Sequence, residues 1–153
     1  MARFLEVFPP EKVSFDVESK GKSEVIGALL DLALKDQGMT PQARGRLLKK
    51  ILERESNGST AVGSVAIPHV KVKSVEQTIG AMAVFPDGID FQAVDGEPVY
   101  SVFLLISPES QSEEHLQALR WIARLVRQAD YTPFVRRTRT PEQVMSLLEE
   151  MGS

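Results

Sequence analysis

The chain has 153 residues, no cysteine and only two histidines, His69 and His115. The lack of cysteine excludes disulfides, thiolate nucleophiles and metal sites built on thiolates. No apolar run approaches the ~18 residues of a membrane-spanning helix, so we expect no direct membrane insertion. The formal net charge of −3 gives no basic field, and we therefore expect no nucleic-acid partner. The N-terminus lacks the long apolar core of a secretion signal, which favours a cytoplasmic protein.

The length suits a single domain over residues 1–153. Apolar periodicity predicts helices over 23–37, 41–55 and 113–128, and two more that open at Thr132-Pro133 and at Thr140-Pro141. Strands are predicted over 13–17, 65–67, 80–85 and 98–107, the last apolar on both parities as in a strand covered on both faces. Interleaved helices and strands indicate an α/β fold with layers around one sheet.

Local signals suggest where these elements begin and end. Ser23, Thr40 and Ser110 are placed as helix N-caps, and Ser110 with Glu113 fits a capping box. The segment Pro86-Asp87-Gly88 is typical of a turn. The strand 65–67 is expected to end just before Pro68 and to deliver His69 on a stiff support, because proline fixes its own φ.

Three residues suit the chemistry of a phosphoryl group: His69 after the strand, His115 in the first turn of a helix, and Arg54 at a helix end. Imidazole is a good nucleophile near neutral pH. Arginine is permanently cationic and matches the geometry of phosphate. A helix N-terminus favours anions. Small residues in the loop 58–64 would let backbone amides approach phosphoryl oxygens.

Each of these residues also has an ordinary structural interpretation. A histidine after proline often serves packing, an arginine near a helix C-terminus complements the dipole, and a histidine in a first helical turn is usually without function. A metal site from the two histidines with Asp87 or Asp90 is not favoured, since no ligand pair has the spacing of a known motif. We predict no metal and no cofactor.

The order of several segments resembles the enzyme IIA family of the phosphotransferase system, of the fructose, mannitol and nitrogen-regulatory type. The similarity runs from residue 5 to residue 150. The segments that carry it are Glu53-Arg54-Glu55, Ser59-Thr60, Val65-Ala66-Ile67-Pro68-His69, Gly88-Ile89-Asp90-Phe91, Asp95-Gly96-Glu97-Pro98-Val99 and His115-Leu116-Gln117-Ala118-Leu119. Ile-Pro-His followed later by His-Leu-Gln is the specific combination.

The resemblance implies a mixed β-sheet flanked by α-helices and a phosphotransferase activity. His69 would accept a phosphoryl group from a phosphohistidine on an HPr-like carrier. His115 would contact that group or hold His69 in place, and Arg54 would balance its charge. Thr60, with Ser59, Gly63 and nearby backbone, would line the pocket.

The same resemblance leaves the receiver of the phosphoryl group open. A nitrogen-regulatory protein would signal to a target protein, a sugar-transport enzyme IIA would pass the group to an enzyme IIB, and a third possibility is a non-catalytic binding module. No transporter or IIB segment is fused to this sequence, which favours the regulatory interpretation. Two departures from the family pattern stand out. The loop from Thr60 to His69 is one residue short, and Val70 replaces a frequent glycine, so we expect its branched side chain to narrow access to His69 or reshape the docking surface.

Overall fold

The computed structural model describes residues 2–18, 20–58, 60–61, 63–93 and 95–152. Its centre is a five-stranded sheet with the order β1-β4-β5-β2, in which β3 also pairs with β5. The strands are β1 (Val13–Ser14), β2 (Val65–Ala66), β3 (His69–Val72), β4 (Ile79–Ile89) and β5 (Val99–Pro108). β4 and β5 are antiparallel, whereas the other pairs are parallel. The sheet is therefore mixed, as expected for the predicted α/β fold.

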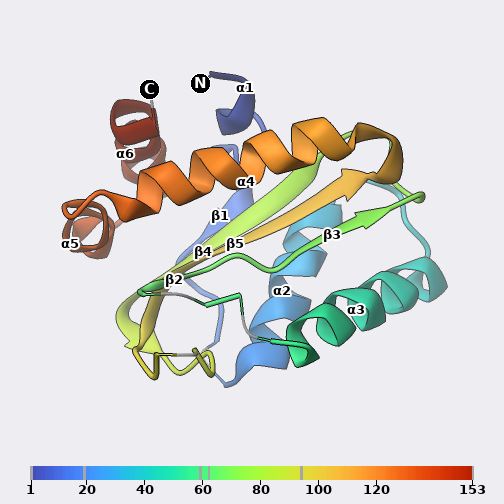
Figure 1. The fold of residues 1–153 in the computed structure, drawn as a ribbon, viewed down its shortest axis with the longest axis horizontal. Coiled ribbons are helices and arrows are strands. Elements are labelled where there is room, and N and C mark those ends of the chain that lie inside the picture. Colours follow the sequence, from blue (N-terminus) through green and yellow to red (C-terminus); the bar gives the residue numbers. More distant parts are fainter. Residues whose placement is uncertain (1, 19, 59, 62, 94, 153) are drawn as a thin grey trace.

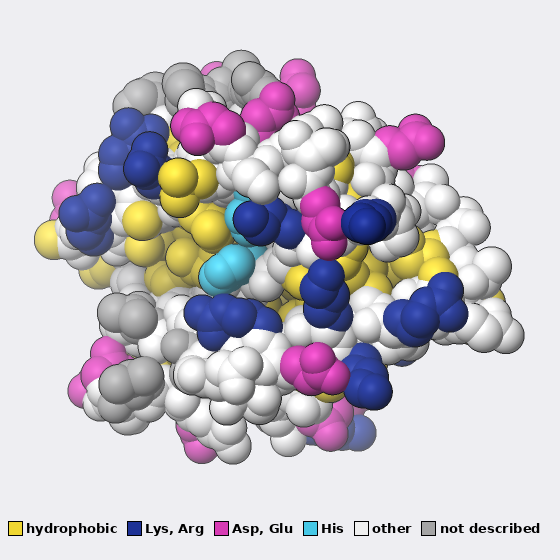
Figure 2. Space-filling model, turned by 45° about the vertical axis from the view of Figure 1, so that its right-hand side comes forward, with side chains coloured by type: hydrophobic (Ala, Val, Ile, Leu, Met, Phe, Trp, Pro, Cys, Tyr) yellow, Lys and Arg dark blue, Asp and Glu magenta, His cyan; other side chains and the backbone are white. Residues whose placement is uncertain are grey.

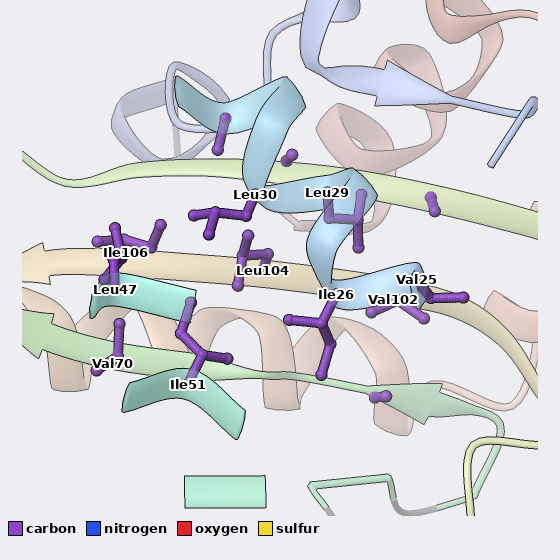
Figure 3. Packing of buried hydrophobic residues seen from close by; sticks show 14 of the residues in the cluster. Val25, Ile26, Leu29, Leu30, Leu47, Ile51, Val70, Val102, Leu104 and Ile106 are labelled. Carbon is purple, nitrogen blue, oxygen red and sulfur yellow. The ribbon is translucent and has the colours of Figure 1, made fainter. Parts of the chain in front are cut away.

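Helices cover both faces of this sheet (Figure 1). They are α1 (Ala2–Leu5), α2 (Lys22–Leu34), α3 (Pro41–Ser56), α4 (Ser112–Arg127), α5 (Tyr131–Arg137) and α6 (Pro141–Gly152). α2 and α3 pack on one face, where their apolar side chains meet those of β3 and β5 (Figure 3). α4, α5 and α6 cover the other face around the buried Trp121. None of the helices in the described segments combines the length and apolar character needed to cross a membrane.

One of the three predicted helix N-caps is correct, and the other two are wrong. Thr40 caps α3 as predicted, because its Oγ1 accepts a hydrogen bond from the amide of Ala43 at 3.1 Å. Ser23 is not a cap, since α2 already begins at Lys22. Ser110 is not a cap either, because it lies within a 3-10 turn, Glu109–Gln111, that leads directly into α4.

The predicted turn at Pro86-Asp87-Gly88 is wrong. These residues continue β4 to Ile89, and the register against β5 shifts between Val84 and Ile89. Gly88 has a φ of +78°, and a Cβ atom there would come within 2.9 Å of the Tyr100 ring. Turn-forming residues therefore produce an irregularity within a long strand rather than its end.

β2 and β3 form one interrupted edge strand along β5. Val65 pairs with Ser101 and His69 with Leu105, so the register is the same on both sides of the break. The break falls at Pro68, which has no N–H to donate, although its carbonyl accepts from the amide of Leu105 at 3.0 Å. His69 therefore follows β2, as predicted, and is also the first residue of β3.

Candidate active site

The fold brings the two histidines of the sequence together. His69 opens β3 and His115 lies near the start of α4, and their ring centroids are 5.7 Å apart with an interplanar angle of 49°. His115 is buried, with 5% of its surface exposed, whereas His69 is half-buried. Figure 2 shows histidine side chains in a hollow between hydrophobic side chains and a row of Lys and Arg side chains. One small group could therefore contact both rings.

The hydrogen bond of His69 determines which of its nitrogens is available. Nδ1 lies 2.6 Å from the carbonyl oxygen of Ile67, two residues earlier across Pro68. A carbonyl can only accept, so Nδ1 carries the proton and donates it. In the neutral ring, Nε2 then has a free lone pair. The backbone thus orients the imidazole and leaves Nε2 as the nitrogen with a lone pair for a chemical role.

His115 is held in an uncharged state by its surroundings. Its Nδ1 lies 2.7 Å from the hydroxyl of Ser107 on β5. Burial, together with repulsion from the neighbouring His69 and Lys71, lowers the pKa of His115 to about 4. Near pH 7 this ring is neutral and carries one proton, so it can act as a hydrogen-bond donor or acceptor but not as a cation.

This lowered pKa predicts an acid-labile contribution to stability. In the unfolded chain His115 takes up a proton near pH 6.5, whereas the folded protein resists this until about pH 4. Because the unfolded state binds more protons in that window, stability falls as the pH drops from 6.5 to 4. We expect a loss of about 2 kcal/mol after solvent screening is allowed for. Urea unfolding at several pH values should show a shallower pH dependence for His115→Gln, and parallel curves would contradict the prediction.

Two lysines near the pair were not singled out by the sequence. Lys71 is exposed, and its Nζ donates to the Ser112 hydroxyl at 3.3 Å, at the start of α4. Lys50 of α3 donates to the Lys71 carbonyl at 3.0 Å. The alternation of β3 contained the signal, since residues 69 and 71 point to the same face of a strand. Lys71 adds positive charge beside His115, and Lys50 lies next to Lys71.

Alternation also settles the position of Val70. Its side chain faces away from His69 and packs against α3 at Leu47 and Ile51 (Figure 3), with 7% of its surface exposed. The expectation that Val70 narrows access to His69 or reshapes the surface around it is therefore wrong. A branched residue at this position belongs to the core below the sheet.

The remaining candidate residues lie in the last turn of α3 and in the loop that joins α3 to β2. The side chain of Arg54 is exposed, and its Nη1 donates a hydrogen bond to the Gly58 carbonyl at 3.0 Å. Thr60 directs both its amide and its hydroxyl to the Glu55 carboxylate. The Gly63 amide donates to Asp95 at 2.9 Å. These donors are engaged within the protein, so their contact with a phosphoryl group stays a prediction. Ser59 lies outside the described residues.

Metal chemistry has no support from the arrangement of side chains. In the part of the chain that the structure describes, no group of three or more His, Asp or Glu side chains is placed to hold a metal ion. Lys71 is a cation that acts on His115, and the neighbouring Lys50 lies 3.7 Å from Glu109. Such a site suits an anion and an imidazole nucleophile.

Comparison with known proteins identifies the family to which this chain belongs. A family model described as the phosphoenolpyruvate-dependent sugar phosphotransferase system, EIIA 2, matches residues 6–151. The chain therefore belongs to the type 2 enzyme IIA family of the phosphotransferase system, and the family resemblance found in the sequence is confirmed.

Individual relatives narrow the comparison. A nitrogen regulatory protein from Bradyrhizobium diazoefficiens is 42% identical over 122 residues, covering 79% of this chain and 80% of the relative. The crystal structure of nitrogen regulatory protein IIA-Ntr from Neisseria meningitidis has a TM-score of 0.84 at 27% identity, covering 94% of this chain and 97% of that one. Enzyme IIA for mannitol from Escherichia coli, solved in complex with its phosphorylated enzyme IIB, shares the fold with a TM-score of 0.74 at 19% identity over 94% and 99% of the chains.

Proposed function

We propose that this protein is a phosphocarrier that accepts a phosphoryl group on Nε2 of His69. The observation that carries the proposal is the hydrogen bond from His69 Nδ1 to the Ile67 carbonyl. The centroid of the His69 ring lies 5.7 Å from that of His115. This bond leaves a lone pair on Nε2 of a half-buried ring, in a hollow bordered by Lys and Arg side chains (Figure 2). The family supplies the phosphoryl chemistry, and the geometry supplies a nucleophile with a fixed tautomer.

The transfer exchanges one P–N bond for another. The lone pair of His69 Nε2 attacks the phosphorus of a phosphohistidine on an HPr-like carrier, and the electron pair of the breaking bond returns to the donor imidazole. Charge spreads over the three phosphoryl oxygens during this step, so positioning and cationic groups provide most of the catalysis. Lys71, whose charge acts on His115, is proposed to serve this purpose together with the neighbouring Lys50 and with Arg54. His115, neutral at pH 7, is proposed to donate a hydrogen bond to one oxygen.

We propose a nitrogen-regulatory role in which the phosphorylated and the unphosphorylated protein are two signalling states. Two similar proteins, from Bradyrhizobium diazoefficiens and Neisseria meningitidis, carry the name nitrogen regulatory protein. Phosphorylation adds about −1.5 to −2 charges to the hollow. Leu116, beside His115, has 41% of its surface exposed. A partner that covers Leu116 would feel the added charge directly.

Transfer to an enzyme IIB in sugar uptake is the second candidate. It is favoured by the family description, which names a sugar phosphotransferase system, and by the mannitol complex of the same fold. The two functions differ in their response to an enzyme IIB of the fructose or mannitol class. The phosphorylated regulatory protein should keep its phosphoryl group when this IIB is added, whereas a transport protein should lose it within seconds.

Incubation with phosphoenolpyruvate, enzyme I and an HPr-like carrier tests the proposal. We expect a mass increase equal to one phosphoryl group that is lost in acid and retained in base, as for a phosphohistidine. Carriers of the sugar and nitrogen branches should both be tried, since the shortened loop could restrict the donor. Absence of labelling with either carrier would overturn the phosphocarrier function.

Replacing His115 by alanine should slow the transfer without abolishing it. The variant removes one proposed donor to the phosphoryl oxygens, which we expect to lower the single-turnover rate about a hundredfold. His69 keeps its bond to the Ile67 carbonyl, so the final extent of labelling should match the wild type. Rapid-quench kinetics measure both quantities, and an unchanged rate would exclude a direct role for His115.

A further inference from the structure

Ser107 is a buried hydroxyl that the steps above leave without a role. It lies on β5, its side chain is fully buried, and its Oγ lies 2.7 Å from His115 Nδ1. The hydroxyl of Thr78, which precedes β4, donates to the same Oγ at 3.2 Å. The three side chains thus form a line of hydrogen bonds from Thr78 through Ser107 to the imidazole.

The direction of the Thr78 bond determines what Ser107 offers to the ring. A serine hydroxyl has one proton and two lone pairs, and Thr78 occupies one of the lone pairs. If His115 Nδ1 were protonated, Ser107 would accept from both sides and its own proton would be buried without an acceptor. Such an unpaired buried donor is costly, whereas donation to an unprotonated Nδ1 satisfies every group.

We infer that Ser107, held by Thr78, donates its proton to Nδ1 of His115 and fixes that ring in the Nε2–H tautomer. Ser107 is then a positioning residue for the proposed transfer, and this part of the inference rests on the proposed function. The tautomer itself is a property of the unphosphorylated protein and holds whether or not His69 is phosphorylated.

The consequence is that the two paired imidazoles carry opposite tautomers. His69 is tied through Nδ1–H to a carbonyl, so its Nε2 presents a lone pair to phosphorus. His115 accepts at Nδ1, so its Nε2 presents a proton to a phosphoryl oxygen. Because neutral His115 has a single proton, the other tautomer would turn a lone pair toward the phosphoryl oxygens and repel them. A buried serine in an apolar strand therefore decides whether the second histidine helps or hinders.

The ¹⁵N shifts of the imidazole nitrogens test the tautomer directly. In the unphosphorylated wild type at pH 7.5 we expect an unprotonated Nδ1 and a protonated Nε2 for His115, and the reverse for His69. Ser107→Ala should give His115 signals averaged between the two tautomers, and Thr78→Val should shift them in the same direction. The matched control is Ser101→Ala, which removes an equally buried hydroxyl on β5 whose partner is the Tyr131 hydroxyl at 3.0 Å. It should leave His115 unchanged.

Transfer kinetics test the positioning role separately. Ser107→Ala should slow transfer to His69 about tenfold, the effect of weakening one hydrogen bond to the transferred group, with KM for the carrier unchanged. Ser101→Ala should transfer at the wild-type rate. A wild-type His115 protonated on Nδ1, or a Ser107→Ala protein that keeps the pure Nε2–H tautomer, would overturn the inference. If the wild type is never phosphorylated while the shifts are as expected, the proposed function fails and the tautomer assignment stands.

Discussion

Replacing His69 by alanine is expected to abolish phosphorylation of the protein completely. The variant removes the nucleophilic atom, and neither a lysine nor an arginine near the site can replace an imidazole that has a free lone pair at neutral pH. The measurement is the acid-labile mass increase after incubation with phosphoenolpyruvate, enzyme I and an HPr-like carrier. His69 is half-buried at the edge of the sheet, so the substitution should leave the amide spectrum and the unfolding free energy close to those of the wild type.

The small number of histidines makes this experiment decisive. Only His69 and His115 can carry a phosphohistidine, so the two single alanine variants cover every possibility. We expect full but slow labelling of His115→Ala and none of His69→Ala. Labelling that survives in His69→Ala and disappears in His115→Ala would reverse the two roles. His115 is the poorer candidate because its Nδ1 is engaged by Ser107 and 5% of its surface is exposed.

The sequence predicted the pairing of the histidines through the family resemblance, not through local pattern. His69 and His115 are 46 residues apart, and no periodicity connects a strand start with a helix start. Their meeting depends on β3 running parallel to β5, because β5 leads through the 3-10 turn into α4. β2 ends before Pro68, as predicted, but the sequence did not show that β3 begins at His69 or that the His69 ring reaches back to the Ile67 carbonyl.

Residues that act through another side chain were missed, because their signal lies in three-dimensional contacts. Ser107 is one polar residue in a long apolar run, and nothing in the run indicates that it faces His115. Glu55 is part of a recognised segment, yet its partner Lys22 lies on another helix, 33 positions earlier. Lys71 could have been found, because strand alternation from His69 places both side chains on one face.

The incorrect fold predictions share one physical cause. Ser110, Ser23 and the Pro86–Gly88 segment all carry strong local preferences that tertiary packing overrides. A serine near a helix start became part of a 3-10 turn, and a turn sequence became a strand irregularity fitted against Tyr100. Long, strongly patterned elements such as α3 and the fully covered β5 were predicted within a residue or two, because burial and local preference agree there.

Replacing Glu55 by alanine should destabilise the protein more than any other substitution of a charged residue named above. Its side chain is 3% exposed and forms an ion pair with Lys22 Nζ at 2.9 Å, and the side chain of Lys22 is 13% exposed. Lys22 also lies over the Phe91 ring at 5.3 Å. Loss of the carboxylate leaves a nearly buried ammonium without its partner, which typically costs about 3–5 kcal/mol. Urea unfolding at pH 7 measures the change.

The chain offers a matched control that joins the same two helices. Asp31 of α2 and Arg44 of α3 form an ion pair at 2.7 Å, but their side chains are 63% and 33% exposed. Asp31→Ala should cost only about 0.2–1 kcal/mol, because an exposed pair gains little over its hydration. The double variant Lys22→Met with Glu55→Leu should recover much of the Glu55→Ala loss, since it removes both charges and fills the volume. A Glu55→Ala loss no larger than that of Asp31→Ala would refute the importance of the buried pair.

Glu55→Ala also tests whether the Lys22–Glu55 pair orders the segment that precedes His69 or only stabilises the whole fold. The Glu55 carboxylate accepts hydrogen bonds from the amide and the hydroxyl of Thr60, so its loss should increase the mobility of the loop from α3 to β2. Arg54 is tied to this path through the Gly58 carbonyl, and its guanidinium should lose its fixed position as well. Amide exchange of Thr60 should accelerate more in Glu55→Ala than exchange in β5, whereas Asp31→Ala should leave the ratio unchanged. Equal acceleration throughout the chain would mean that the Lys22–Glu55 pair stabilises the fold without ordering the site.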